Sequence, residues 1–330
     1  MRAILHIGGE KTGSTSIQWL LDANRAVLAE AGFGVPRGLG SSNHVALAAY
    51  AGRDAMVQDL LAMLGDAEGL AALRAWMPAR LASMLRALPA GVHTVLLSNE
   101  HCQSRLLDET EIARLRDLLA PHFSEVVVLV YLRRQDEVVI SLRNTALRSH
   151  GRLPEAWFPR DAGSLAVLDH EALLRRWAAV FGRQALRPRL YRAAEAEHLA
   201  DYLAACGVPA LPLRLPRRLN RSLSPAAEAW LAGQRGSGPW PPAGINQMIN
   251  TLEREFPGPG ARPARAEAAA FLARFAAGNE AVRAAWFPGQ ASLFDPGLVG
   301  YPLAATPAPA PAELAAVAAR LAAPEAPPAG

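Results

Sequence analysis

The chain has 330 residues, and its 34 Lys plus Arg against 30 Asp plus Glu give a formal net charge of only +4. A charge this small suits an anionic small molecule and does not favour binding to a long nucleic acid. The two cysteines, Cys102 and Cys206, have neither the number nor the spacing of a disulfide framework or a zinc site, so a reducing compartment without a structural metal is expected. No apolar run is long enough to span a membrane, and the first predicted strand begins too early for a signal peptide, so we expect a cytoplasmic protein.

Apolar strands alternate with helical patterns along the first two thirds of the chain. The expected strands cover residues 3–7, 94–97, 126–132 and 186–191. Asp108 and Glu111 are spaced as a capping box and predict a helix from there to Leu119. The run 126–132 is apolar throughout, as in a strand buried on both faces. This order predicts an α/β fold with a central, mainly parallel sheet flanked by helices.

The character of the sequence changes after Gly207. Helical stretches are expected at 225–233, 244–254 and 265–284, with no strands between them. The last segment is low in complexity and biased toward Pro and Ala. The sequence therefore predicts an α/β core at 1–206, an appended helical region at 207–301 that completes the fold, and a flexible tail at 302–330.

The segment 3–18, AILHIGGEKTGSTSIQ, combines an apolar strand, a Gly-rich turn with one lysine, and the start of a helix. Such a turn directs successive backbone N–H groups toward one point, and the helix N-terminus adds unpaired donors and a positive dipole end. The segment therefore predicts a phosphate-binding loop. A Walker A loop has its lysine after the last glycine, whereas Lys11 precedes Gly13 here, so the ATP-binding mode of P-loop NTPases is not expected.

Residues 7–18, IGGEKTGSTSIQ, resemble the loop with which PAPS-dependent sulfotransferases bind the 5′-phosphosulfate of their donor. The family pattern is roughly [PK]-K-[TS]-G-[ST]-[ST], followed by an apolar helix. The resemblance is to soluble, bacterial-type members, and it implies a P-loop-like sulfotransferase fold that uses 3′-phosphoadenosine 5′-phosphosulfate (PAPS) and requires no metal. The donor-binding residues implied by the match are Lys11, Thr12, Gly13, Ser14, Thr15 and Ser16. Lys11 would also favour the transition state by placing a cation over the bridging oxygen.

A second motif, YLRRQDEVVISLRN, covers residues 131–144. In the sulfotransferases an arginine at the end of a central strand and a serine eight positions later bind the 3′-phosphate of the donor, which pairs Arg133 with Ser141 here. A planar guanidinium suits contact with two phosphate oxygens. Arg134 is the alternative, because it lies seven positions before Ser141 and would share its helical face.

A third motif, SNEHCQS at 98–104, follows the second long strand. Ligands of open α/β sheets bind outside the carboxyl ends of the strands, so Glu100 and His101 should lie beside the loop. The resemblance implies that one of them is the general base, and alternation at the strand end suggests that only one faces the donor. His44 and the basic segment 217–221, RRLNR, are weaker candidates for contacts with substrate.

Taken with the resemblance, these motifs predict in-line transfer of a sulfuryl group from PAPS to a hydroxyl or amine of a carbohydrate, lipid or small metabolite. The helical region would then complete the acceptor cleft. The alternatives are a P-loop-like phosphotransferase, which would need Mg²⁺ ligands that the sequence does not indicate, and a non-catalytic nucleotide-binding protein. The sequence specifies neither the acceptor nor the oligomeric state.

Overall fold

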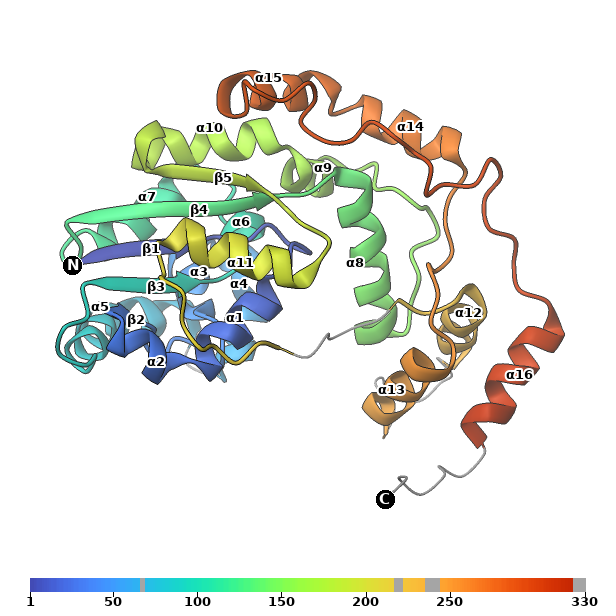
Figure 1. The fold of residues 1–330 in the computed structure, drawn as a ribbon, viewed down its shortest axis with the longest axis horizontal. Coiled ribbons are helices and arrows are strands. Elements are labelled where there is room, and N and C mark those ends of the chain that lie inside the picture. Colours follow the sequence, from blue (N-terminus) through green and yellow to red (C-terminus); the bar gives the residue numbers. More distant parts are fainter. Residues whose placement is uncertain (66–68, 217–221, 235–243, 323–330) are drawn as a thin grey trace. The chain divides into compact units, whose positions relative to one another are not determined.

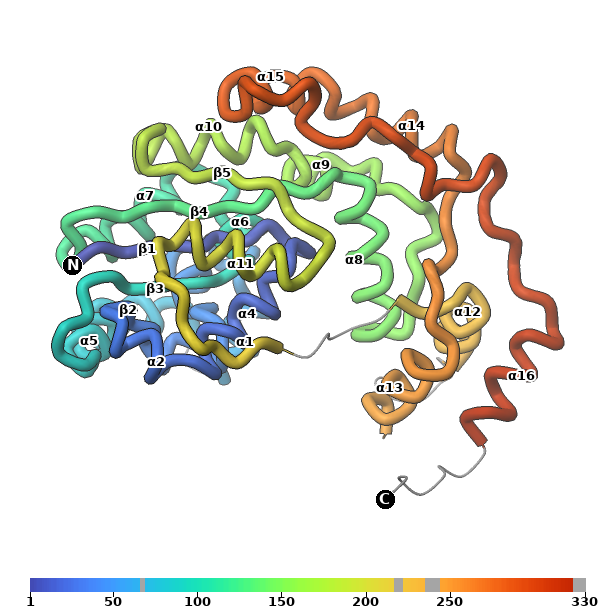
Figure 2. The backbone as a smooth tube through the Cα atoms, in the orientation of Figure 1, coloured from blue at the N-terminus to red at the C-terminus, as the bar shows by residue number. Residues whose placement is uncertain are grey.

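The structure is a computed structural model that describes residues 1–65, 69–216, 222–234 and 244–322. The chain divides into two compact units. The first unit comprises Met1–Arg133, Asp161–Arg217 and Ala277–Leu293, and the second comprises Arg134–Arg160, Arg218–Ala276 and Phe294–Gly330. Figure 2 shows the path of the backbone, coloured from blue at the N-terminus to red at the C-terminus.

The first unit contains the sheet. Its five strands are all parallel and lie in the order β2-β3-β1-β4-β5 (Figure 1). Their bounds are β1 (Arg2–His6), β2 (Phe33–Gly34), β3 (Thr94–Ser98), β4 (Glu125–Leu132) and β5 (Leu186–Leu190). The four expected strands are thus found where the apolar runs predicted them, and the predicted parallel α/β sheet is confirmed. The additional edge strand β2 has two residues, too few to produce a periodic pattern.

Helices of the first unit cover the sheet and connect its strands. They are α1 (Ser14–Ala23), α2 (Arg25–Glu30), α3 (Val45–Ala51), α4 (Asp54–Leu64), α5 (Gly69–Arg86), α6 (His101–Arg105), α7 (Glu109–Leu119), α9 (Ala162–Leu168), α10 (His170–Phe181), the 3₁₀ turn η1 (Arg183–Ala185), α11 (Glu195–Cys206) and α15 (Ala276–Trp286). At the start of α7, the Asp108 carboxylate accepts from the Thr110 N–H at 2.8 Å and the Glu111 carboxylate accepts from the Asp108 N–H at 3.0 Å. The predicted capping box is therefore confirmed.

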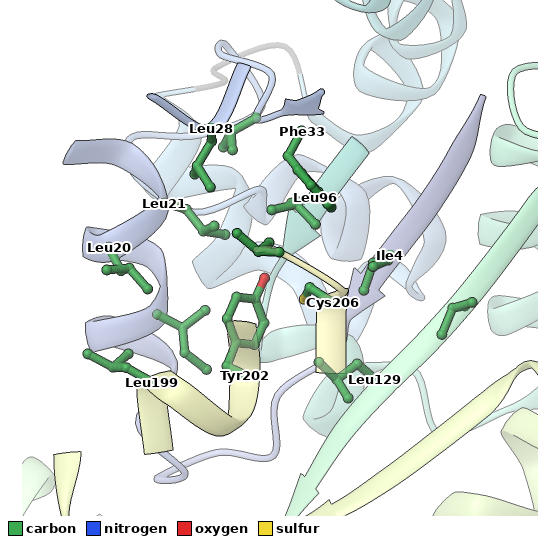
Figure 3. Close-up of a cluster of buried hydrophobic side chains, with 14 of the residues drawn as sticks. Ile4, Leu20, Leu21, Leu28, Phe33, Leu96, Leu129, Leu199, Tyr202 and Cys206 are labelled. Atoms are coloured by element: carbon green, nitrogen blue, oxygen red, sulfur yellow. The ribbon is translucent and has the colours of Figure 1, made fainter. Parts of the chain in front are cut away.

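One face of the sheet packs against α1, α2 and α11 in a single apolar cluster (Figure 3). Ile4 and Leu129 come from the strands, Leu20 from α1 and Tyr202 from α11, and each is at most 1% exposed. Side chains alternate along a strand, so Leu5 points to the opposite face, where it is also fully buried. The sheet is therefore covered on both faces, as its apolar strands require.

The second unit is helical within its described residues. It contains α8 (Gln135–His150), α12 (Pro225–Gly233), α13 (Ile245–Glu255), α14 (Arg265–Ala273) and α16 (Pro311–Ala322) around a small apolar core that includes Leu147, Leu231 and Leu252. Helix α8 packs with α12 and α14 of the same unit. For this reason residues 134–160 group with the later helices, whereas the sequence predicted one continuous core to residue 206.

Helix α16 lies in the segment that the sequence predicted to be a flexible tail. Its sequence, PAELAAVAARLA, consists mainly of Ala and Leu, which are strong helix formers, and Val317 is fully buried in the core of the second unit. Low complexity therefore does not exclude regular structure at 311–322. Among the described residues, no helix combines the length and the apolar composition that a membrane span requires.

Candidate functional site

The loop between β1 and α1, residues 7–13, lies where two neighbouring strands also end. A Cβ on Gly8 would lie 2.6 Å from the Cα of Glu100, just after β3, and a Cβ on Gly9 would lie 2.8 Å from the carbonyl oxygen of Tyr131 in β4. Only glycine fits at these two positions. Gly8 and Gly13 also have φ values of +89° and +78°, and between them Lys11 has +63°. Left-handed residues among right-handed ones turn successive amides toward a common point, as in anion-binding nests.

Several polar groups of this loop remain available for a ligand. In the part of the chain that the structure describes, no acceptor takes the backbone N–H groups of Gly13, Ser14 and Thr15. The Ser14 hydroxyl is likewise buried without a hydrogen-bond partner among the described residues. Unsatisfied donors at a helix N-terminus attract anions, so the arrangement is compatible with the phosphate-binding loop that the sequence predicts.

The other hydroxyls of the loop are already engaged or exposed. The Thr12 hydroxyl donates to the Gly9 carbonyl at 2.6 Å and so closes the turn from within. The Ser16 hydroxyl donates to the Glu195 carboxylate on α11, and Thr15 is exposed. Of the residues predicted to bind the donor, Thr12 therefore shapes the loop, and Ser16 links the start of α1 to α11.

Arg133 lies beside this loop at the end of β4. Its Nη1 donates to the Lys11 carbonyl at 2.8 Å, and its guanidinium lies over the ring of Tyr191, 4.6 Å from the ring centroid. His170 Nε2 lies 2.9 Å from the Arg133 carbonyl oxygen, to which it donates. The guanidinium is thus fixed next to Lys11, and its contact with a phosphate stays a prediction.

Arg134, the alternative candidate, is used within the second unit. It donates to both carboxylate oxygens of Asp136, at 2.8 and 2.9 Å, and to the carbonyls of Asp295 and Gly297, at 2.8 Å each. The Tyr301 hydroxyl donates to the same Asp136 carboxylate at 2.6 Å. This network fastens the start of α8 to the segment 295–301.

Ser141 lies in the middle of α8 and is partly buried. Its carbonyl accepts from the Thr145 hydroxyl at 3.1 Å. Ser141 belongs to the second unit and Arg133 to the first, so their joint contact with one phosphate stays a prediction.

Both candidates for the base lie against the loop. Glu100 adjoins Gly8, and its carboxylate accepts from Gln18 Nε2 at 2.5 Å. His101 Nδ1 lies 3.9 Å from a carboxylate oxygen of Glu10. Residue 100 is in the right-handed helical region, with φ −68° and ψ −24°. The alternation expected at the strand end therefore does not reach these residues, because the chain has already left the strand.

Two further residues hold the loop and were not among the predicted site residues. The Gln103 side chain accepts from the Glu10 N–H at 3.3 Å and donates to the Val167 carbonyl at 2.6 Å. Gln18 on α1 and Gln103 on α6 are each 4% exposed. Gln103 could have been found, since it belongs to the motif 98–104, whereas no sequence signal connects Gln18 with Glu100.

His44 has a structural place. Its Nδ1 accepts from the Ser98 N–H at 3.0 Å, and its Nε2 donates to the Pro36 carbonyl at 3.1 Å. Burial lowers the pKa of His44 to about 4, so the ring is neutral near pH 7. It joins the loop after β2 to the end of β3. The basic segment 217–221 lies outside the described residues.

Comparisons with known proteins add the following. No family model and no curated protein matches the chain. Among solved structures, it is similar to a sulfotransferase from Alicyclobacillus acidocaldarius, with 14% identity, a TM-score of 0.45, and coverage of 86% of this chain and 98% of that one. It is also similar to the sulfotransferase domain of the Synechococcus PCC 7002 olefin synthase, with 12% identity, a TM-score of 0.39, and coverage of 84% and 94%. A third similar structure is the sulfotransferase domain from the curacin biosynthetic pathway, with 11% identity, a TM-score of 0.37, and coverage of 64% and 76%. These identities are too low to carry a residue role from one chain to another.

Proposed function

We propose that this protein is a sulfotransferase that moves a sulfuryl group from PAPS to a hydroxyl or amine of a carbohydrate, lipid or small metabolite. One observation carries the proposal: three kinds of group meet at one edge of the sheet. They are a phosphate-type loop with Lys11, an arginine held beside that lysine, and two candidate bases against the same loop. Sulfuryl transfer requires an anion site, a cation at the leaving oxygen and a base for the acceptor.

The residues present fit the donor. The buried, unpartnered Ser14 hydroxyl and the backbone N–H groups of residues 13–15 would hold the 5′-phosphosulfate. Arg133 would hold the 3′-phosphate, with Ser141 as its partner according to the family resemblance. Arg134 is the poorer candidate, because its N–H groups already bind Asp136 and two carbonyls.

When bound, PAPS supplies an activated sulfuryl group with a phosphate as the leaving group. Lys11 would bring its ammonium to the bridging oxygen, where negative charge develops during in-line displacement. Glu100 or His101 would take the proton of the acceptor hydroxyl, a role typically worth about 10²- to 10⁴-fold in rate. Gln18 donates to Glu100 Oε2, which fixes the carboxylate and leaves its other oxygen to meet the acceptor.

Ligand-induced stabilisation tests the proposal. The product analogue 3′-phosphoadenosine 5′-phosphate should raise the melting temperature without added metal, and by more than ATP with Mg²⁺ does. The opposite ranking would favour a phosphotransferase and would refute the proposal. Product formation with labelled PAPS and cell extracts would then identify the acceptor.

Variants of the two cations separate binding from chemistry. Arg133→Ala should weaken binding of the bisphosphate by about 10- to 150-fold, the equivalent of about 1.5–3 kcal/mol for hydrogen bonds to a charged group. Lys11→Ala should lower kcat more than donor affinity. Arg116→Ala, which removes an exposed arginine paired with Asp117 on α7, is the matched control and should change neither. Unaltered donor affinity in Arg133→Ala would exclude the proposed contact.

Single-turnover measurements on Glu100→Gln and His101→Ala should identify the base. The variant that removes the base should slow transfer by at least about 10²-fold with donor affinity nearly unchanged. If neither substitution slows transfer, the base lies elsewhere and the assignment to residues 100 and 101 is wrong.

A further inference from the structure

His198, on α11, lies directly against the phosphate-type loop although nearly 200 residues separate them in the sequence. A Cβ on Gly13 would lie 2.8 Å from Cδ2 and 2.9 Å from Nε2 of this histidine. The imidazole thus occupies the space into which a side chain at position 13 would extend. The absence of a side chain at Gly13 is what allows α11 to approach the start of α1 this closely.

The imidazole is held on both sides by tyrosines. Its ring centroid lies 4.4 Å from that of Tyr131 and 5.0 Å from that of Tyr191, in edge-to-face contacts with interplanar angles of 63° and 64°. The residue is 1% exposed. Such a side chain has no room to turn, so it acts as a rigid wedge between β4, the end of β5 and the loop.

The wedge also reaches Arg133. Tyr191 contacts His198 on one side and carries the Arg133 guanidinium at 4.6 Å from its ring centroid. Arg133 in turn donates to the Lys11 carbonyl within the loop. The contacts thus run from the loop to His198, on to Tyr191 and Arg133, and back to the loop at Lys11.

The chemical state of His198 is unusual for a buried histidine. Neither ring nitrogen has a hydrogen bond of good geometry among the described residues, although the Thr12 backbone in the loop is close enough to raise the pKa of the ring. Burial, the largest cause, lowers its pKa to about 4, and the Asp201 carboxylate, the Thr12 backbone and the Glu195 carboxylate only partly oppose this, so the ring is neutral near pH 7. The ring therefore lies against the loop residues Thr12 and Gly13 and the two tyrosines, which indicates a role in the site.

We propose that His198 is a positioning residue of the donor site, where it presses against Gly13 and keeps the N–H groups of residues 13–15 directed at the bound anion. The inference rests on the proposed function, since the anion is taken to be the 5′-phosphosulfate of the donor. Through Tyr191, the same ring sets the place of Arg133. His198 thereby couples the two ends at which a bisphosphate nucleotide would be held.

Calorimetric titration with 3′-phosphoadenosine 5′-phosphate tests the inference. His198→Ala should raise Kd by about 10-fold, with kcat at saturating donor changed by less than about 2-fold, because the loop is loosened but no reacting group is lost. His198→Phe, which keeps a flat ring of similar size, should restore most of the affinity. His122→Ala, at a histidine in the same unit that contacts Phe123, is the matched control and should bind as the wild type does.

Hydrogen exchange of the ligand-free protein gives a second readout that does not depend on the identity of the donor. The Ser16 and Ile17 N–H groups both donate to the Gly13 carbonyl, at 3.0 and 3.2 Å. Their exchange should be faster in His198→Ala than in the wild type and in His122→Ala. If His198→Ala does not fold, Tyr191→Leu removes the ring that links His198 to Arg133 and should produce the same changes.

The outcomes are distinct. Wild-type affinity together with wild-type exchange in His198→Ala would overturn the role of His198, as would a His198→Phe variant as weak as His198→Ala. Failure of the wild type to bind the bisphosphate would instead overturn the proposed function. In that case the exchange measurement would still decide whether His198 positions the loop.

Discussion

Acidification should destabilise the first unit well above the pH at which most carboxylates titrate. Four of its histidines, His6, His44, His170 and His198, are at most 7% exposed. In each, burial is the largest cause of a lowered pKa, from 6.5 to about 3 in His6 and to about 4 in the other three. His44 illustrates why, since its nitrogens accept from the Ser98 N–H and donate to the Pro36 carbonyl, and this arrangement requires the neutral ring.

The sign and size of the effect follow from proton linkage. Because the folded-state pKa lies below the unfolded value, the stabilisation is fully present above pH 6.5 and is lost as the pH falls toward 4. Between about pH 6.5 and pH 5, the unfolded state binds one more proton per histidine than the folded state does. Over these about 1.5 pH units, each histidine therefore lowers the free energy of unfolding by about 2 kcal/mol. Four such groups together cost about 8 kcal/mol, comparable with the whole stability of a typical domain, about 5–15 kcal/mol.

Urea titrations from pH 8 to pH 5, with hydrogen exchange of peptides from β1, β3 and β4 as the probe, measure this loss in the first unit alone. Carboxylates with a lowered pKa, such as that of Asp108, titrate below this window. His44→Gln should reduce the pH dependence by about one quarter, and the control His122→Gln should keep it. A free energy of unfolding that is equal within about 1 kcal/mol at pH 8 and pH 5 would refute the reasoning, because buried neutral imidazoles cannot be acid-insensitive.

Three further substitutions have expected outcomes. Gly13→Ala should lower stability by about 2–4 kcal/mol, measured by urea unfolding, because φ is +78° and the new methyl would meet His198; an unchanged midpoint would contradict the close approach. Arg134→Ala should destabilise the second unit by about 3–5 kcal/mol, since it leaves the buried Asp136 carboxylate without its guanidinium partner and with the Tyr301 hydroxyl as a remaining donor. Bisphosphate affinity should change by less than about 2-fold, in contrast to Arg133→Ala. Asp108→Ala should cost about 1 kcal/mol through loss of the capping box, without an effect on turnover.

The sequence predicted those parts of the fold whose signals are local. The apolar runs of β1, β3, β4 and β5 and the capping box of α7 each lie within a few residues, so periodicity and cap chemistry find them. The two-residue strand β2 is too short for such a signal. Helix α16 was missed because its composition resembles a mobile tail, and its order depends on burial of Val317 in a core assembled from distant segments.

The same distinction applies to the candidate site. The loop 7–13 was recognisable because its glycines, lysine and hydroxyls are contiguous. The different surroundings of Arg133 and Arg134 could not be recognised in this way. The direction of the Arg134 guanidinium depends on the carbonyls of residues 295 and 297, about 160 residues away. No sequence pattern indicated a role for His198, since its contact with Gly13 exists only after α11 has packed beside α1.

The strand order has a consequence for the direction of the proposed reaction. β1 lies between β3 and β4, so the loop that would hold the transferred group follows the middle strand. The candidate bases follow β3 on one side, and Arg133 follows β4 on the other. In-line displacement requires the acceptor and the leaving phosphate on opposite sides of the sulfur. A donor whose nucleotide end is held by Arg133 would therefore leave the β3 side open to the acceptor, where Glu100 and His101 lie. The acceptor should accordingly be sought among molecules that can reach the end of β3.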